Sequence, residues 1–413
     1  MKLLTQKIIK NPLVSSSFIM LIGTNLYNAS QFLYHSLTGR FLGKAYYGDL
    51  AALISILGLI SIVQLSFGLT IIKFIASQKD KRKLANLIKW ISLWSIVGGI
   101  SLGLITLIIA PFISKFLNLQ QIYGVYVLVP TVAITIIVTA YRSILQGILE
   151  FKKYVISFIS EAAAKIILLI LFIALGLTVF KGILAIFLSI IFGLLVARLF
   201  LGEYLKGKRG EKPEVAPIVR YSMPVLIQGL ALTSMYSTDL MLVKHFFTPE
   251  QAGLYASLII LGRIVFFGAS PITNVMFPLI VKRHSDGEPY HNILYLSTVL
   301  VGLVSLSIVS LYLFLPSLPI NILYGQGYLE GAPLLWLFGL FMSLLGLSVL
   351  FIQFYLSIGK TKVVWLFVLA ALLQAVLIWF LHGSIETVVK NSIITSALLL
   401  FSLLVYFPYH HKK

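Results

Sequence analysis

The chain has 413 residues, of which 59% are hydrophobic and 11% are charged, and its formal net charge is +19 at pH 7. Because an ordinary soluble domain has about 25% charged residues, this composition excludes a soluble globular protein and predicts a membrane protein. The sequence contains no cysteine, which excludes a disulfide framework, thiolate chemistry and a thiolate metal site.

The first apolar segment, 13–38, is long enough to cross a bilayer as a helix, which requires about twenty residues. Polar side chains recur along it at steps of three and four and therefore share one helical face: Thr24, Asn28, Gln31, His35 and Thr38. Polar side chains are costly in lipid, so this face is predicted to line a water-filled cavity or to contact neighbouring helices. The candidate cavity residues on this helix are Asn25, Asn28, Gln31 and His35.

About twelve apolar runs of spanning length follow one another along the chain. They lie near residues 13–38, 50–75, 87–112, 122–145, 155–177, 182–201, 218–246, 252–280, 292–315, 332–355, 363–382 and 387–407. No small-residue cleavage site follows the first run, which is therefore expected to be a retained span. Most of the 32 Lys and Arg residues lie near membrane ends on the side of the N-terminus, so the positive-inside rule predicts that both termini are cytoplasmic. This asymmetry explains most of the net charge without a nucleic-acid partner.

Two segments at an offset of 205 positions resemble each other without a gap. Phe41–Leu53, FLGKAYYGDLAAL, aligns with Phe246–Leu258, FFTPEQAGLYASL, and Gly48 falls on Gly253. Because the offset is almost half of the chain, the sequence indicates two homologous halves. We predict an all-α polytopic membrane protein with an N-terminal six-helix lobe at 1–205, a cytoplasmic linker at 206–217 and a C-terminal six-helix lobe at 218–413.

Sequence motifs for catalysis or cofactor binding are incomplete in this chain. The run Ile358-Gly359-Lys360-Thr361 resembles the end of a phosphate-binding loop, but position 354 is Phe where that motif requires Gly. No histidine pair has metal-ligand spacing within an apolar run, and the loops on the outer side are too short for a folded catalytic domain. We therefore expect a protein that is not an enzyme and that needs no metal or cofactor.

Charged side chains within a span are costly and are usually functional. Glu161 and Lys165 stand four residues apart in the fifth run, so they can pair with each other on one helical face. Arg263 lies about 16 Å from the outer end of the eighth run, near the middle of the bilayer. Asp239 in the seventh run is a candidate partner, and both a structural Asp239–Arg263 bridge and an anion bound by Arg263 stay open. Arg40, at the end of the first run, lies either at a cavity mouth or in the headgroup region.

Three prolines, Pro130, Pro224 and Pro271, fall inside apolar runs. Proline removes a helical hydrogen bond there and bends the helix. Two similar bundles of bent helices around a polar cleft are expected of a transporter that opens alternately to the two sides of the membrane. The sequence therefore predicts alternating access.

Several short motifs together resemble those of polysaccharide-export flippases. In the first half these motifs are Arg40-Phe-Leu-Gly43 with Gly48, and Leu145-Gln146-Gly147. In the second half they are Asp239-Leu-Met-Leu, Ala252-Gly253-Leu254-Tyr255-Ala256, Met276-Phe277-Pro278 and Ser357-Ile-Gly-Lys360. In the order and spacing of these motifs, essentially the whole chain resembles the oligosaccharide-lipid flippase branch of the multidrug/oligosaccharidyl-lipid/polysaccharide (MOP) exporter superfamily.

The resemblance implies a two-lobe, twelve-helix, MATE-like fold in the cytoplasmic membrane. It implies outward movement of a polyprenyl-(pyro)phosphate-linked oligosaccharide through a cationic cavity, for which Arg263, Arg40 and Lys165 are the candidate cations here. Outward movement of an anion gains about 2.3 kcal/mol per charge per 100 mV when the inside is negative. Na+ or H+ as a coupling ion, and contact with membrane lipids and with a glycan polymerase or ligase, belong to the same expectation. Arg263→Ala is predicted to abolish transport and to leave membrane insertion intact.

Three alternatives remain at this point. A cation-coupled multidrug antiporter of the same superfamily is expected to place carboxylates in its cavity, and the first span has none. A peptidoglycan-precursor lipid flippase usually carries two helices more than the twelve expected here. A purely structural membrane protein needs neither a polar helical face nor charges in the middle of its spans.

Overall fold

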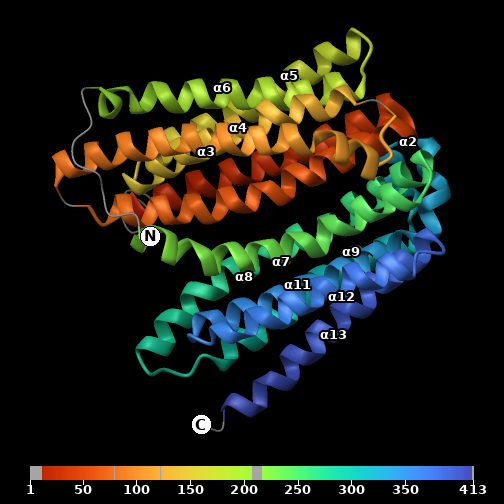
Figure 1. Ribbon diagram of the computed structural model, residues 1–413. Helices are drawn as coiled ribbons and strands as arrows, with labels where there is room; N and C mark the ends of the chain where they lie inside the picture. Colours follow the sequence, from red (N-terminus) through yellow and green to blue (C-terminus); the bar gives the residue numbers. More distant parts are fainter. Residues whose placement is uncertain (1–11, 79, 121, 207–215, 412–413) are drawn as a thin grey trace, which may run out of the picture. The chain divides into compact units, whose positions relative to one another are not determined.

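A computed structural model describes residues 12–78, 80–120, 122–206 and 216–411, and the regular structure in these ranges is helical throughout (Figure 1). The α-helices are α2 (Pro12–Ala76), α3 (Lys81–Phe116), α4 (Tyr123–Gly147), α5 (Phe151–Ala174), α6 (Val179–Leu205), α7 (Ala216–Phe246), α8 (Pro249–Ser285), α9 (His291–Phe314), α10 (Ser317–Leu323), α11 (Leu335–Ser357), α12 (Val364–Phe380) and α13 (Ile385–His411). Two 3-10 helices, η1 (Gln326–Leu334) and η2 (Thr361–Val363), precede α11 and α12.

Every predicted apolar run lies on one of these helices, and the first two runs share the 65-residue helix α2. Within the described residues, ten helical segments are long and apolar enough to cross a membrane. The prediction of an all-α polytopic membrane protein is therefore confirmed. The number of spans and the cytoplasmic position of the termini stay predictions.

Local capping signals explain where several helices begin. The Asp80 carboxylate accepts hydrogen bonds from the backbone N–H groups of Arg82 and Lys83 at the start of α3. These two bonds stabilise the ionised form and hold the pKa of Asp80 below its ordinary value. Helix α8 begins with a capping box, in which Thr248 and Gln251 each bond the backbone N–H of the other, and Pro249 occupies the first turn.

Helix α2 is broken at Gly43, whose backbone has φ +73° and ψ 168°. A side chain rarely tolerates this conformation, whereas glycine adopts it at little steric cost. The break coincides with a boundary in the fold, because the chain separates into two compact units. Unit 1 comprises Met1–Leu42 and Ile56–Gly229, and unit 2 comprises Gly43–Ser55 and Leu230–Lys413. We call Gly43–Ser55 the docked segment, because it comes from the first half of the sequence and belongs to unit 2.

Unit 1 is built mainly from α3, α4, α5 and α6. Helix α4 packs against α3 and α6, and α5 packs against α6, as the orange to yellow-green helices of Figure 1 show. Close approach of α3 and α4 depends on Gly99, since a Cβ atom there would lie 2.5 Å from the carbonyl oxygen of Ala133. The predicted linker at 206–217 lies outside the described residues, apart from Lys206 and the first two residues of α7.

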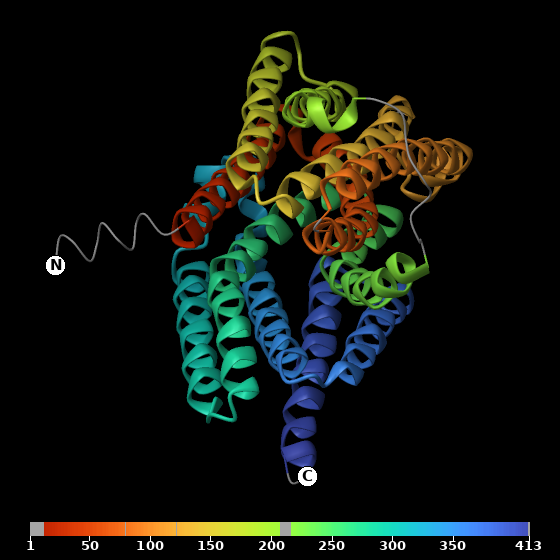
Figure 2. The same ribbon diagram turned by 90° about the vertical axis from the view of Figure 1, so that its left-hand side faces the viewer.

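Unit 2 is organised around α11, which packs against α8, α9 and α13. Figure 2 shows α8 and α9 side by side as a hairpin (teal), and α12 packs on α13. Buried aromatic side chains of α11, including Phe338, Phe341 and Phe354, fill the space between these helices. The unit therefore has its own apolar core.

The two glycines that the internal repeat aligns are in direct contact within unit 2. A Cβ atom at Gly48 would lie 2.8 Å from the backbone nitrogen of Gly253, and one at Gly253 would lie 1.8 Å from the carbonyl oxygen of Lys44. No side chain fits at so short a distance from backbone atoms. The docked segment and the start of α8 therefore touch backbone to backbone.

A buried ion pair also holds the docked segment in place. Asp49 Oδ1 lies 2.6 Å from Lys244 Nζ at the end of α7, and the two side chains are 2% and 1% exposed. Nearby, the hydroxyls of Tyr47 and Tyr324 lie 3.1 Å apart in a hydrogen bond. The first half of the sequence thus contributes a charged, fully buried side chain to the core of unit 2.

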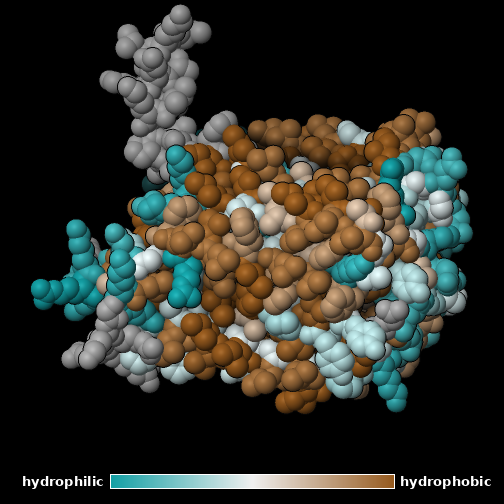
Figure 3. Space-filling model, turned by 90° about the horizontal axis from the view of Figure 1, so that it is seen from above, coloured by the Kyte–Doolittle hydropathy of each residue, from teal (hydrophilic) through white to brown (hydrophobic). Residues whose placement is uncertain are grey.

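The surface seen in Figure 3 is mostly apolar, with hydrophilic side chains gathered at two opposite edges. Large apolar side chains point outward along the helices, among them Ile108 of α3 at 78% exposed and Leu199 of α6 at 79% exposed. Such exposure is unfavourable in water and is expected where helices face lipid. The chain is therefore a multi-pass membrane protein.

Candidate functional site

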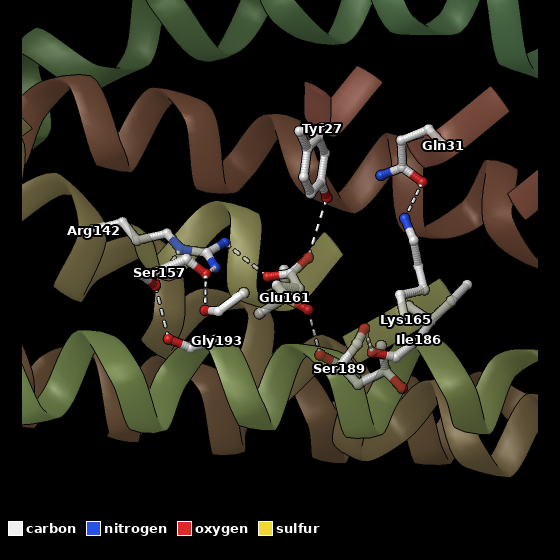
Figure 4. Close-up of polar contacts among 12 residues, drawn as sticks. Tyr27, Gln31, Arg142, Ser157, Glu161, Lys165, Ile186, Ser189 and Gly193 are labelled. Atoms are coloured by element: carbon white, nitrogen blue, oxygen red, sulfur yellow. Dashed lines mark hydrogen bonds and ion pairs between the residues drawn. The ribbon is translucent and has the colours of Figure 1, made fainter. Parts of the chain in front are cut away.

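Unit 1 contains a cluster of charged and aromatic side chains contributed by α2, α4 and α5 and closed by α6 (Figure 4). Its three charged members are Arg142 of α4 and Glu161 and Lys165 of α5, which are 7%, 5% and 2% exposed. Tyr27 and Gln31 reach the same cluster from α2. Charges buried to this degree require partners, and the choice of partners decides what the cluster can bind.

Glu161 pairs with an arginine of the neighbouring helix α4. Its Oε2 lies 2.8 Å from Arg142 Nη1, and its Oε1 accepts a hydrogen bond of 3.2 Å from the Tyr27 hydroxyl. Glu161 and Lys165, which the sequence allowed to pair on one helical face, form no direct ion pair in the described residues, because Arg142 occupies the Glu161 carboxylate. A planar guanidinium on α4 meets the carboxylate directly and supplies donors in a fixed geometry, whereas the Lys165 ammonium turns toward α2.

Arg142 is itself held in position by α5 and α6. Its Nε donates to Ser157 Oγ at 3.1 Å, and its Nη2 donates to the carbonyl oxygen of Ser157 at 2.7 Å. The Ser157 hydroxyl in turn donates to the carbonyl oxygen of Gly193 at 2.8 Å. A Cβ atom at Gly193 would lie 2.5 Å from Arg142 Nη2 and 3.0 Å from Glu161 Cβ, so α6 approaches the ion pair closely only because this residue is glycine.

Lys165 forms no ion pair with any residue that the structure describes. Its Nζ donates to Gln31 Oε1 at 2.6 Å, and it lies 5.2 Å and 5.5 Å from the ring centroids of Tyr27 and Tyr34. Both rings attract the cation through their π faces, and the Tyr34 hydroxyl is fixed by a 2.8 Å hydrogen bond to the carbonyl of Gly182. Since one carboxylate, Glu161, faces two cations, Arg142 and Lys165, the cluster has a net positive formal charge.

The other predicted residues of the first span also lie on α2. Asn25 is exposed, Asn28 is half-buried, and His35 is 8% exposed with its ring edge-on to Tyr34 at 5.9 Å. Arg40 is exposed near the break of α2. The structure thus brings Gln31 and Lys165 together by a direct hydrogen bond.

Arg263 and Asp239, which lie in unit 2, make separate contacts. The Arg263 Nη2 donates to the carbonyl oxygen of Tyr236, and the guanidinium lies 5.2 Å from the centroid of that tyrosine ring. Asp239 is fully buried and accepts hydrogen bonds of 2.7 Å from the Tyr255 hydroxyl and from the backbone N–H of Leu240. Among the described residues the predicted Asp239–Arg263 bridge does not form, so Arg263 keeps its charge without a carboxylate in contact.

Three residues of the cluster, Arg142, Tyr27 and Ser157, are not evident from the sequence alone. Arg142 stands only three residues inside the end of its apolar run, where it resembles an interfacial cation. The position of Arg142 within an apolar run is the one sign in the sequence that it could be functional. Its partner, however, depends on which helices are neighbours in the fold. No group of three or more His, Asp or Glu side chains able to hold a metal occurs in the part of the chain that the structure describes.

Comparison with known proteins places the chain in a family. The family model described as "Polysaccharide biosynthesis protein" matches residues 13–284. The chain belongs to this family. Its sequence is 26% identical to an uncharacterized membrane protein of Methanocaldococcus jannaschii over 366 residues, which cover 83% of each chain.

Solved structures of the MOP superfamily share the fold of this polysaccharide biosynthesis family member. One is an inward-facing multidrug resistance MATE family transporter, with a TM-score of 0.77, 16% sequence identity and coverage of 98% of this chain and 100% of that one. Another is the lipid II flippase MurJ in an inward closed conformation, with a TM-score of 0.73, 15% identity and coverage of 95% and 87%. The predicted MATE-like fold is therefore confirmed.

Proposed function

We propose that this protein flips a polyprenyl-(pyro)phosphate-linked oligosaccharide from the cytoplasmic to the outer leaflet of the cytoplasmic membrane, by alternating access and without a catalytic step. The family supports a place in polysaccharide biosynthesis. A lipid-linked precursor is made on one side of a membrane and used on the other, so such a pathway requires a transporter. The fold supports transport, because MATE transporters and a lipid II flippase share it.

The observation that carries the proposal is the net positive formal charge of the buried cluster around Lys165. A buried ammonium held by the Gln31 amide and two tyrosine rings retains a strong attraction for an anion, because low-dielectric surroundings screen it weakly. A phosphate oxygen that replaced the neutral amide oxygen of Gln31 would also bear a negative charge, so that the donor and the acceptor of the bond would both be ionised. The cluster therefore favours a phosphate over a cationic substrate.

A multidrug antiporter is the second candidate, and the fold comparison includes one. A cationic drug requires an available carboxylate in the cavity. In unit 1 the carboxylate of Glu161 is 5% exposed and bonded to Arg142 and Tyr27. In unit 2 the carboxylate of Asp239 is fully buried and bonded to Tyr255. The electrostatics of the described residues therefore favour the anionic substrate.

The proposal is tested in cells that lack this protein. We expect lipid-linked oligosaccharide to accumulate on the cytoplasmic side, and the wild-type chain to clear it. Lys165→Gln and Arg263→Ala should fail to clear it, because each removes a cation that has no carboxylate partner. Lys153→Gln is the matched control for Lys165, since Lys153 is a half-exposed lysine of α5 in a surface pair with Glu150.

Two results would overturn the proposal. One is normal glycan export with increased sensitivity to cationic drugs in cells that lack the protein, which would support the antiporter. The other is full export by Lys165→Gln and Arg263→Ala, which would show that neither cation meets the substrate. Membrane insertion of every variant is measured in the same cells, so a folding defect is not mistaken for a transport defect.

A further inference from the structure

A cavity lies within unit 2 and is separate from the cluster around Lys165. It has a volume of about 190 Å³ and is bounded by α7, α8 and α11. Four of its lining side chains are polar, namely Ser270, Thr273 and Asn274 of α8 and Gln353 of α11, and the ring of Phe266 forms part of its apolar wall. No charged residue lines it.

The two amides of this cavity are available to a ligand. Neither Asn274 nor Gln353 makes a side-chain hydrogen bond to any residue that the structure describes. By contrast, the Ser270 hydroxyl donates to the carbonyl oxygen of Phe267 at 2.9 Å, which replaces the helical bond that Pro271 cannot form. An amide offers both a donor and an acceptor, so Asn274 and Gln353 can pair with neutral polar groups.

A cation adjoins the cavity on the same helical face. Arg263, Phe266, Ser270 and Asn274 follow at steps of three and four, which align their side chains along α8. The Arg263 guanidinium lies over the Tyr236 ring, and that ring is 6.2 Å from the Phe266 ring in the cavity wall. The face therefore presents a positive charge followed by a neutral, partly aromatic pocket.

The chemistry of the lining selects among ligands. A cationic drug would find no carboxylate here, and a phosphate would find no cation inside the pocket. A lipid tail would leave the two amides without hydrogen bonds, which is costly in the membrane. A sugar ring has an apolar face for Phe266 and hydroxyl or acetamido groups for the amides. The volume is below the roughly 300–1,000 Å³ of pockets for drug-sized ligands, so it suits one ring.

We propose that this cavity is a subsite for a single uncharged sugar ring of the substrate, bound by Asn274, Gln353 and Phe266, next to Arg263. The inference rests on the proposed function, because it assumes a sugar attached to a lipid (pyro)phosphate. It adds a recognition element for the glycan that is distinct from the anion-binding role of Lys165. Binding at this subsite would make affinity depend on whether the lipid carries a sugar.

The test uses the full-length protein in lipid nanodiscs and two probes, a short-chain polyprenyl pyrophosphate and the same lipid with one N-acetylhexosamine. The wild-type chain should bind the sugar-bearing lipid more tightly. Asn274→Leu and Gln353→Leu should each weaken that binding by about threefold to tenfold, the usual effect of one neutral hydrogen bond. Both variants should bind the sugar-free lipid normally, which also shows that they are folded.

Matched variants separate this subsite from the anion site. Ser307→Leu changes an exposed polar residue of α9 outside the cavity and should leave both affinities unchanged. Lys165→Gln should weaken the binding of both lipids by the same factor, because both lipids carry the pyrophosphate.

Three outcomes would overturn the subsite. If the wild-type chain binds both lipids equally, no sugar site exists, although the proposed function stands. If Asn274→Leu and Gln353→Leu weaken the binding of both lipids alike, or weaken the binding of neither, the cavity does not bind the sugar. If the wild-type chain binds neither lipid, the proposed function fails, and the subsite fails with it.

Discussion

Arg142 decides what the charged cluster of unit 1 can bind. Without it, Glu161 would leave a buried carboxylate beside Lys165, and the two would cancel. With it, Glu161 is satisfied by an ion pair of 2.8 Å and by Tyr27, so the charge of Lys165 is the net charge of the cluster. One arginine from a neighbouring helix thus changes the formal charge of the cluster from neutral to positive.

Arg142→Leu should strongly destabilise the protein, because it leaves the carboxylate of Glu161 buried without its cation. The expected loss is about 3–5 kcal/mol of unfolding free energy, measured by thermal unfolding in detergent. Lys390→Ala provides the comparison, since the exposed i,i+4 pair of Lys390 with Glu386 should contribute only about 0.3–0.5 kcal/mol. Equal effects of the two substitutions would contradict a buried pair in unit 1.

Gly193→Ala should also destabilise the protein, by about 1–3 kcal/mol, because its methyl group would overlap Arg142 Nη2 and press on Glu161. The matched substitution is Gly202→Ala on the same helix, where a Cβ atom meets no atom within 4 Å. That variant should be as stable as the wild type or more stable by up to about 1 kcal/mol, since alanine favours the helix. Thermal unfolding of the two variants side by side tests the close approach of α6 to the ion pair.

At the scale of elements, the docked segment is the least expected feature. It begins at the break of α2, contacts α8 through Gly48 and Gly253, and places Asp49 against Lys244 of α7. Because the internal repeat aligns the two glycines with each other, equivalent positions of the two halves meet in one contact. Close packing therefore gives a physical reason for glycine at both of these positions.

Gly253→Ala should displace the docked segment, because the new methyl group would lie 1.8 Å from the carbonyl oxygen of Lys44. Backbone atoms cannot move aside as a flexible side chain can, so the Asp49–Lys244 pair should be disturbed as well. Hydrogen exchange of residues 43–55 is the direct readout and should increase. In Gly268→Ala, also on α8, the nearest atom to the Cβ is 3.6 Å away, and exchange in the docked segment should not change.

For the whole molecule, the sequence predicted the helices, the internal repeat and two of the three charged residues of the cluster. Apolar runs of spanning length and mid-span charges are properties of one segment, so Glu161 and Lys165 could be found from the sequence alone. The partner of a charged side chain depends on which helices are neighbours, and for this reason the sequence does not reveal the pairing of Glu161 with Arg142. Asp49 was missed because the residues around it resemble a loop, whereas the structure buries them in unit 2.

The membrane potential should drive the proposed reaction outward. Each net negative charge that crosses gains about 2.3 kcal/mol per 100 mV, which corresponds to a roughly 50-fold shift in the distribution between leaflets. In proteoliposomes with the chain in its predicted orientation, an imposed potential that is negative inside should move anionic lipid to the outer leaflet. A distribution that does not respond to the potential would contradict net movement of an anion.

The most direct test of the central claim is the movement of a fluorescent polyprenyl-pyrophosphate oligosaccharide between leaflets of proteoliposomes that contain only this protein. A quencher added outside reports the fraction of the lipid that has crossed. We expect rapid crossing with the wild-type chain, none with Lys165→Gln, and no movement of a cationic dye by either. Transport of the dye without crossing of the lipid would contradict the account and identify the protein as an antiporter.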